Sequence, residues 1–181
     1  DADNEDLKYA TYDGSSWTTS IADSAGHVGM YNSLAVDSSG NVHISYFDAD
    51  NEDLKYATYD GSSWTTSIAD SAGHVGMYNS LAVDSSGNVH ISYFDADNED
   101  LKYATYDGSS WTISTADSAG DVGMHNSLAV NSSGDVYISY YDRTNEDLKY
   151  ATLSGGNSSV SANEITVQFG DYGNVTGTVV D

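Results

Sequence analysis

A 47-residue unit repeats along almost the whole chain. Residues 1–47 recur letter for letter at 48–94, residues 95–141 are a lightly altered copy, and residues 142–152 begin a fourth. Self-similarity at a fixed period is typical of repeat architectures, in which neighbouring units bury apolar surface that one unit alone leaves exposed. The repeat therefore constrains the fold more strongly than any local motif does.

Each repeat predicts four short β-strands and no helix. The strand candidates alternate apolar and polar residues or are rich in β-branched and aromatic residues. In the second copy they are Leu54–Tyr59, Trp64–Ile68, Ser80–Val83 and Val89–Phe94. Turns rich in Asp, Asn, Gly and Ser separate most of them, whereas a longer irregular connection is predicted at Ala69–Asn79.

Four antiparallel strands that recur at this spacing predict an all-β fold, a β-propeller of four-stranded blades around a central axis. Ser80–Val83 is short and contains small residues, so it is predicted to be the innermost strand. The Val89–Phe94, Leu54–Tyr59 and Trp64–Ile68 types of strand follow outward in that order. An open solenoid is the alternative, but the long connection before the innermost strand favours the closed propeller.

The repeats predict about four blades, of which the first and last are incomplete. Residues 1–23 hold two outer strands, complete blades lie at about 27–70 and 74–117, and a partial blade occupies 121–153. The C-terminal β tail at 154–181 differs: a Gly/Ser linker precedes two β-like runs. These runs complete a blade, pair with a neighbouring chain or start another domain. Because unpaired strand edges recruit further strands, self-association is predicted.

The charge of the chain restricts its partners and its surroundings. With 28 acidic and five basic residues, the formal net charge is -23, which repels nucleic acid and anionic membranes. No segment is apolar enough for membrane insertion, and there is no Cys for a disulfide or a thiolate metal site. The start without Met suggests a mature product or a fragment. Three glycosylation sequons, at Asn131, Asn157 and Asn174, agree with an extracellular or cell-surface protein.

An acidic stretch, DADNED, opens each of the first three repeats and suggests a Ca²⁺ site. Alternating carboxylates supply the oxygen ligands that this ion accepts. The candidate ligands are Asp1, Asp3, Asp6, Asp48, Asp50, Asp53, Asp95, Asp97 and Asp100. The alternative is a four-residue hairpin turn whose side chains satisfy backbone N–H groups. The fourth copy, which contains Arg143, has lost one acid, and no other cofactor is predicted.

The long connection and the DADNED turn are predicted to share one face of the propeller. That face would carry acidic and aromatic side chains suited to a sugar, a cation or a surface protein. The candidates are His27, Tyr31, His74, Tyr78 and His125. The alternative is that these are merely the equal loops that every repeat protein exposes. His43 and His90 lie in strands, where Tyr137 replaces them in the next copy, so they are predicted to be packed rings.

The hairpin between the two outer strands contains Tyr-Asp-Gly-Ser-Ser-Trp three times. With the preceding Thr, this turn resembles the Asp-box of sialidase-type β-propellers, although it is one residue shorter and has Asp directly before Gly. In that family the Asp ties the turn and the Trp packs into the blade. The resemblance implies a structural role for Asp13, Trp17, Asp60, Trp64, Asp107 and Trp111. More broadly, the chain resembles secreted propeller repeats of bacteria and archaea.

Catalysis is not predicted. Sialidases bind a carboxylate with three arginines, whereas this chain has only Arg143, and no nucleophile-elbow or zinc-protease motif is present. Repetition places equivalent carboxylates in every blade, but acid–base catalysis requires an unequal pair. The main prediction is a non-catalytic extracellular propeller for adhesion, scaffolding or filament-type self-assembly. The alternative is a carbohydrate-binding propeller lectin with equivalent sites between blades.

Overall fold

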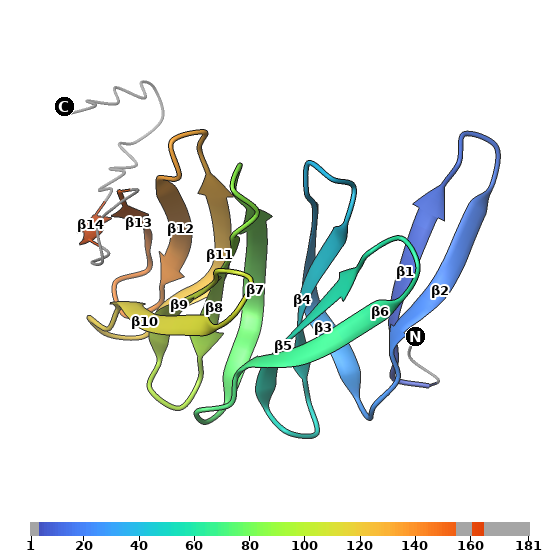
Figure 1. The fold of residues 1–181 in the computed structure, drawn as a ribbon. Coiled ribbons are helices and arrows are strands. Elements are labelled where there is room, and N and C mark those ends of the chain that lie inside the picture. Colours follow the sequence, from blue (N-terminus) through green and yellow to red (C-terminus); the bar gives the residue numbers. More distant parts are fainter. Residues whose placement is uncertain (1–3, 155–160, 165–181) are drawn as a thin grey trace, which may run out of the picture.

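The chain forms four antiparallel β-sheets that follow one another in sequence order (Figure 1). The computed structural model describes residues 4–154 and the backbone of residues 161–164. Sheet 1 contains β1 (Leu7–Tyr12) and β2 (Trp17–Asp23). Sheet 2 contains β3 (Val28–Val36), β4 (Val42–Asp48), β5 (Asp53–Tyr59) and β6 (Trp64–Asp70).

The next two sheets repeat this meander. Sheet 3 contains β7 (Val75–Val83), β8 (Val89–Asp95), β9 (Asp100–Tyr106) and β10 (Trp111–Asp117). Sheet 4 contains β11 (Val122–Val130), β12 (Val136–Asp142), β13 (Asp147–Leu153) and β14 (Ser161–Glu164). Within each sheet, every strand pairs with its neighbour in sequence, and β14 pairs with β13 as the fourth strand of sheet 4. The described part of the chain contains no helix, and hence none that could span a membrane.

The hydrophobic core lies between the sheets rather than within any one of them. One cluster joins Leu54 and Tyr56 of sheet 2 to Leu81 and Ile91 of sheet 3. Equivalent clusters join sheet 1 to sheet 2 and sheet 3 to sheet 4. A sheet therefore buries its apolar residues only against a neighbour, as the repeat predicts. The described sheets form an open row, and a closed ring is not present among them (Figure 1).

One element is longer than predicted. The innermost strand was expected at Ser80–Val83, but β7 begins at Val75, which reduces the irregular connection to residues 71–74. The strand stays paired with β8 because its register shifts twice, between Val75 and Met77 and between Met77 and Ser80. Such bulges insert extra residues without ending the pairing. Bulged segments lack simple alternation, so the sequence pattern resembles a loop.

Candidate functional site

The bulges of the inner strands place one aromatic side chain of each repeat in an unusual backbone conformation. Tyr31, Tyr78 and His125 have positive φ angles of 51°, 52° and 51°. Non-glycine residues rarely adopt this left-handed region, and they do so mainly where the surrounding structure enforces it. Strained positions of this kind often lie at binding sites, so these three residues indicate where to look for one.

A buried Asn maintains each bulge in sheets 3 and 4. The Asn79 side-chain amide donates to the carbonyl oxygen of Gly76 at 2.9 Å, and its Oδ1 accepts a hydrogen bond from Ser45 of sheet 2. Asn126 makes the same two bonds, to Gly123 and from Ser92. The Asn is therefore fixed by the preceding sheet, and the bulge that carries the aromatic ring is fixed with it.

Tyr31, Tyr78 and His125 form a continuous line of ring contacts, which we call the aromatic row. The ring centroids of Tyr31 and Tyr78 lie 4.9 Å apart, and those of Tyr78 and His125 lie 4.6 Å apart. These separations are within the range of direct aromatic packing. Tyr31 and His125 are exposed, and Tyr78 is half-buried. The row thus crosses three successive sheets and presents ring surface to solvent.

Two further aromatic residues, not identified from the sequence, support the row from β4 and β8. The Phe47 ring packs edge-on against Tyr31 with 6.1 Å between ring centroids, and the Phe94 ring packs against Tyr78 with 6.2 Å between centroids. His74 stacks on Phe47 with 5.4 Å between centroids and 19° between planes. Both Phe side chains are buried strand residues, so the sequence pattern did not distinguish them from the other core residues.

Acidic side chains of the β4–β5 and β8–β9 turns lie beside the loops that lead into the row. Oδ2 of Asp50 accepts a hydrogen bond from the His27 backbone N–H at 2.9 Å, and Asp97 does the same for His74. Nδ1 of His74 lies 3.9 Å from Oε1 of Glu52. The structure brings together Tyr31, Tyr78 and His125, with His27 and His74 at the adjoining loops, and binding of a partner by this face stays a prediction.

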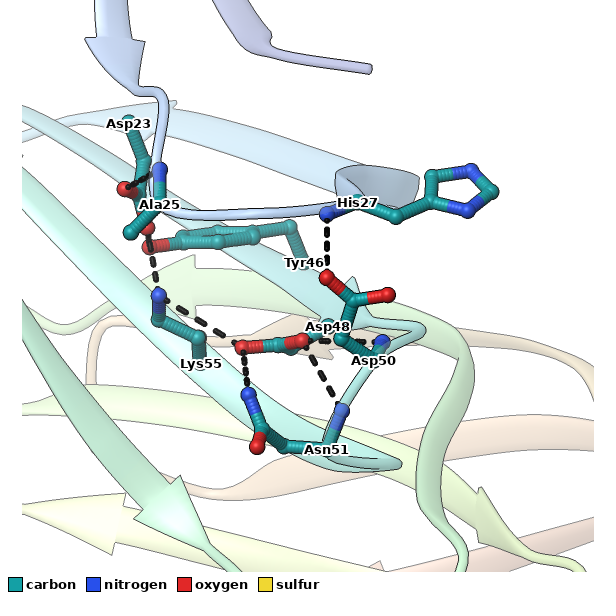
Figure 2. A network of polar contacts seen from close by, with 8 residues as sticks. All are labelled: Asp23, Ala25, His27, Tyr46, Asp48, Asp50, Asn51 and Lys55. Atoms are coloured by element: carbon teal, nitrogen blue, oxygen red, sulfur yellow. Dashed lines mark hydrogen bonds and ion pairs between the residues drawn. The ribbon is translucent and has the colours of Figure 1, made fainter.

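A buried polar network, shown in Figure 2, fixes successive sheets to one another. Asp23, at the end of β2, accepts hydrogen bonds from the Tyr46 hydroxyl and the Lys55 ammonium group, both at 2.6 Å. The Lys55 Nζ also lies 3.7 Å from Oδ2 of Asp48. Asp23 belongs to sheet 1, whereas the other three residues belong to sheet 2. We call this set the intersheet link, and it recurs around Lys102 and Lys149.

The intersheet link binds its own members rather than a ligand. Burial raises the pKa of Asp23, but hydrogen bonds from Lys55 and Tyr46 outweigh burial and hold this pKa below its ordinary value. Burial and the Asp23 carboxylate strongly raise the pKa of Tyr46, so its hydroxyl stays a hydrogen-bond donor. No local sequence pattern predicts this set, because its members are 23 and 32 residues apart.

The carboxylates predicted to bind Ca²⁺ mostly contact the protein itself. Asp48 accepts hydrogen bonds from the Asn51 side chain and from two backbone N–H groups of the turn, and Asp95 repeats this pattern. Burial and then the Asp48 charge raise the pKa of Asp53. Across the described residues, no group of three or more His, Asp or Glu side chains is arranged to hold a metal ion. Asp1 and Asp3 lie outside the described residues, and Ca²⁺ binding stays a prediction.

The fourth copy of the turn replaces these contacts with others of the same geometry. Oγ1 of Thr144 takes the place of the aspartate oxygen and accepts from the Asp121 N–H at 2.8 Å. Arg143 Nη1 donates to Oδ2 of Asp121 at 3.0 Å. Asp121 thus replaces the His74 of the previous copy in the loop, and Arg143 replaces Ala96 in the turn that faces it. This pairing indicates that the turn holds the neighbouring loop in all repeats.

The opposite end of sheets 2 and 3 contains a buried Asp–His–Tyr arrangement. In sheet 3, Nδ1 of His90 shares a hydrogen bond with the Tyr103 hydroxyl, and Nε2 lies 3.4 Å from Oδ2 of Asp84. His43 is placed in the same way between Tyr56 and Asp37. Both rings are buried, in agreement with the prediction of packed histidines.

His90 makes the stability of the protein depend on pH. Burial lowers the pKa of His90 below its ordinary value of 6.5, and Asp84 offsets this only in part. The unfolded chain therefore binds this proton more tightly, so the contribution of His90 to the free energy of unfolding is lost as pH falls below about 6.5. We expect an NMR titration midpoint below 6.5 for the His90 ring. A midpoint at 6.5 or above would contradict this.

A His90→Gln variant provides the thermodynamic control. Because Gln does not titrate, the variant is expected to lose less free energy of unfolding than the parent between about pH 7.5 and pH 5.5. Urea denaturation at both pH values measures the difference. Equal losses in the two proteins would show that other groups cause the pH dependence.

The Asp residues of the outer hairpins tie their turns. Oδ1 of Asp60 accepts from the N–H groups of Ser62 and Ser63 at 2.8 and 2.9 Å, and hydrogen bonds from these two residues lower its pKa to about 2. Asp13 and Asp107 make the same contacts. Trp64 packs edge-on against Tyr9 of sheet 1 and Trp111 against Tyr56 of sheet 2. Trp17 is exposed, and within the described residues its ring contacts Tyr12 of its own sheet rather than a Tyr of another sheet.

Of the glycosylation candidates, only Asn131 lies within the described residues. It is exposed, but its side chain organises the β11–β12 turn: Nδ2 donates to Asp135 at 2.8 Å, and Oδ1 accepts from two backbone N–H groups. Asn157 and Asn174 lie outside the described residues. Glycosylation at all three sites stays a prediction.

The sheet order, the meander and the shared cores define an all-β fold of the β-propeller class. A protein of unknown function from Dyadobacter fermentans is similar with a TM-score of 0.64 and 12% identity, covering 84% of this chain and 56% of that chain. The Aleuria aurantia lectin, in complex with Fucα1-6GlcNAc, gives 0.58 and 19%, covering 90% and 55%. The GH93 α-L-arabinofuranosidase of Fusarium graminearum, with arabinobiose, gives 0.56 and 14%, covering 79% and 50%.

These likenesses concern the fold alone, because all three identities are below 20%. The chain spans about half the length of each of these structures. No protein-family model matches the sequence, and no curated protein sequence matches it.

Proposed function

We propose that this chain is a non-catalytic carbohydrate-binding module that acts outside the cell or at its surface. The observation that carries the proposal is the aromatic row. Three rings from three sheets are in contact, present ring surface to solvent and stand on a strained backbone that buried Asn residues maintain in two of the sheets. The ring contacts distinguish the row from the repeated turns, since Glu52 and Glu99 of those turns share its left-handed backbone.

The chemistry of the row suits a sugar. Exposed aromatic rings pack against the apolar C–H faces of pyranose and furanose rings, while nearby polar groups select the hydroxyls. Burial and then the Tyr78 hydroxyl raise the pKa of Tyr31, so the Tyr31 hydroxyl is protonated at neutral pH. Asp50 and Asp97 use one carboxylate oxygen for a loop N–H, and a carboxylate can accept further hydrogen bonds.

The comparisons support this function over the main prediction from the sequence. Two of the propeller structures that resemble this chain carry a fucosyl disaccharide and arabinobiose. The sequence alone favours adhesion, scaffolding or filament-type assembly over lectin activity. We reverse that order, because the aromatic row is a defined surface for a small ligand, whereas no comparison supports filament formation.

A non-catalytic role agrees with the equivalence of the sheets. The carboxylates near the row are repeated as Asp50 and Asp97, each of which accepts a hydrogen bond from a loop N–H, and as Glu5 and Glu52, each of which lies beside a loop His. Hydrolysis of a glycosidic bond requires two carboxyl groups with different protonation states. Repetition instead offers several equal contacts, which increase the strength of binding to a ligand with many sugar units.

Binding and its loss in a Tyr78→Ala variant test the proposal. We expect a glycan array to show binding, with fucosides and arabinosides as the first classes to examine. Calorimetry with the best oligosaccharide should show an affinity at least about tenfold lower for Tyr78→Ala, because the central ring contacts both others. Tyr12→Ala is the control, since Tyr12 is also exposed but its ring contact within the described residues, with Trp17, lies in its own hairpin and outside the aromatic row. A silent array, or equal losses in both variants, would refute the proposal.

A further inference from the structure

The aromatic row has two halves, and different side chains border them. Tyr31 and Tyr78 form the first half, between sheets 2 and 3, and Tyr78 and His125 form the second half, between sheets 3 and 4. The loop beside the first half carries His74, whereas Asp121 occupies the same position beside the second half. Although the sheets repeat, the two halves therefore offer a ligand different chemistry.

The backbone contacts show that Asp121 lies where His74 lies one copy earlier. The carbonyl oxygen of His74 accepts a hydrogen bond from the Ala96 N–H at 2.8 Å, and that of Asp121 accepts one from Arg143 at 2.8 Å. The residue after each of them donates to the turn of the preceding sheet at 2.9 Å. Because the His74 ring stacks on Phe47, which supports the first half, Asp121 lies at the corresponding point beside the second half.

Arg143 brings a guanidinium group to the second half. Its Nη1 donates to Oδ2 of Asp121 at 3.0 Å, and its side chain is 63% exposed. This bond uses one of the several N–H donors that an arginine holds in one plane, so the others remain open to a ligand. Oδ1 of Asp121 is buried and accepts no hydrogen bond from the described residues. A ligand does not reach this oxygen, and the role of Asp121 is to hold the guanidinium group in place.

We propose that Arg143 determines which sugar the second half of the row accepts, namely a neutral unit with two adjacent free hydroxyl groups. This inference rests on the carbohydrate-binding function proposed above. The planar fork of the guanidinium group donates to two neighbouring oxygen atoms, while the sugar ring packs on Tyr78 and His125. Asp121 is a positioning residue that fixes the fork. The first half has Ala96 at the place of Arg143 and binds a sugar through ring contact instead.

The charges around Arg143 favour a neutral sugar over a sugar with a carboxylate group. Asp121 neutralises the guanidinium group, and Glu146 of the same turn is exposed. Three of the four lysines of the chain are held in the intersheet links, so they do not offset the acidic surface. A carboxylated sugar would approach a negative potential, which does not oppose a neutral pair of hydroxyls.

NMR titration of the Arg143 side chain tests the proposal directly, because this residue is the only arginine of the chain and its Nε–H signal is unique. The probes are methyl fucoside, methyl arabinofuranoside and, for each, the analogue that lacks one hydroxyl of the adjacent pair. We expect a saturable shift of the Arg143 signal with the complete glycosides. The affinity measured at this signal should be about tenfold lower or more for the deoxy analogues, which leave one donor of the fork unpaired.

Exchange of residues between copies removes the subsite without introducing a foreign loop. The combined changes Asp121→His, Arg143→Ala and Thr144→Asp give sheet 4 the loop and turn residues that sheet 3 already carries. We expect calorimetry to show that this variant still binds sugar through the first half of the row but no longer distinguishes the complete glycosides from their deoxy analogues.

The reverse exchange is the matched gain-of-function variant. The changes His74→Asp, Ala96→Arg and Asp97→Thr give sheet 3 the residues of sheet 4. We expect this variant to bind a second equivalent of the complete glycosides with the same dependence on both hydroxyls.

The outcomes separate this inference from the proposed function. An Arg143 signal that stays in place with both glycosides, equal affinities for the deoxy analogues, or tighter binding of methyl galacturonoside would overturn the inference. Carbohydrate binding would still stand in each of these cases if Tyr78→Ala weakens binding of the best oligosaccharide from the array. A chain that binds no glycan would refute both.

Discussion

Replacing Lys55 with Met is expected to lower the free energy of unfolding by about 3–5 kcal/mol. The substitution leaves Asp23 and Asp48 buried without their cation, and the Lys55 ammonium group now lies 2.6 Å from the first and 3.7 Å from the second. Burial of an unpaired carboxylate costs more than loss of the hydrogen bond alone, because the charge is not resolvated. Urea denaturation followed by circular dichroism measures the loss.

Arg143→Met is the matched control for this prediction. Arg143 also forms an ion pair, with 3.0 Å between its Nη1 and Oδ2 of Asp121, but its side chain is largely exposed. Fully exposed pairs contribute about 0–1 kcal/mol. Asp121 is largely buried while Arg143 is solvated, so the loss for Arg143→Met is expected to exceed that range but to stay below the loss for Lys55→Met, whose two acidic partners are both buried. A loss for Lys55→Met no larger than that for Arg143→Met would show that the intersheet link does not stabilise the fold.

A Gly76→Ala substitution is expected to cost about 2–4 kcal/mol. A Cβ atom at Gly76 would lie 2.8 Å from Cα and 2.9 Å from Cβ of Leu54, so the backbones of sheets 2 and 3 would have to separate. The φ angle of +101° adds a conformational cost for any residue with a side chain. Thermal and urea unfolding measure the total effect.

Gly87→Ala separates the two causes. Gly87 has a φ angle of +87°, but an added Cβ would meet no atom within 4 Å. This variant is therefore expected to lose only the conformational part, about 1 kcal/mol. If both variants lose the same free energy, the close approach of Gly76 to Leu54 is not a constraint on the fold.

The sequence predicted the strands of the outer hairpins well, because local rules decide them. Alternation places Leu54–Tyr59 in a strand, and Asp60 with Ser62 and Ser63 closes the turn through contacts over two or three residues. The inner strands were predicted too short. Their two bulges depend on Asn79 and on Ser45 of another sheet, which no local pattern contains.

The candidate site was predicted in part for the same reason. Tyr31, Tyr78 and His125 were selected because loops of equal sequence had to share one face, and the structure adds that their three rings are in contact. Phe47 and Phe94 were missed because a buried strand position does not reveal that its ring also contacts Tyr31 or Tyr78. The intersheet link was missed because its partners are distant in sequence and are common surface residue types.

Substitutions between the copies show which contacts persist when residues change. In the β7–β8 turn, Nδ2 of Asn88 donates to Asp84 at 2.8 Å. In the β11–β12 turn the two residue types are exchanged, and Nδ2 of Asn131 donates to Asp135 at 2.8 Å. The donor and the acceptor have traded places while the bond remains. The two copies differ at two positions here, although the turn keeps its side-chain hydrogen bond.

The intersheet link uses the same side chains at each of its three occurrences, and this has a consequence for how such a gene can change in length. A new unit gained or lost by recombination within the coding repeats finds ready-made partners on both sides, with no second mutation required. Copy number can then vary in whole steps, and each step adds or removes one ring of the aromatic row. Sequences of this type could therefore adjust the extent of the proposed binding surface by slippage alone.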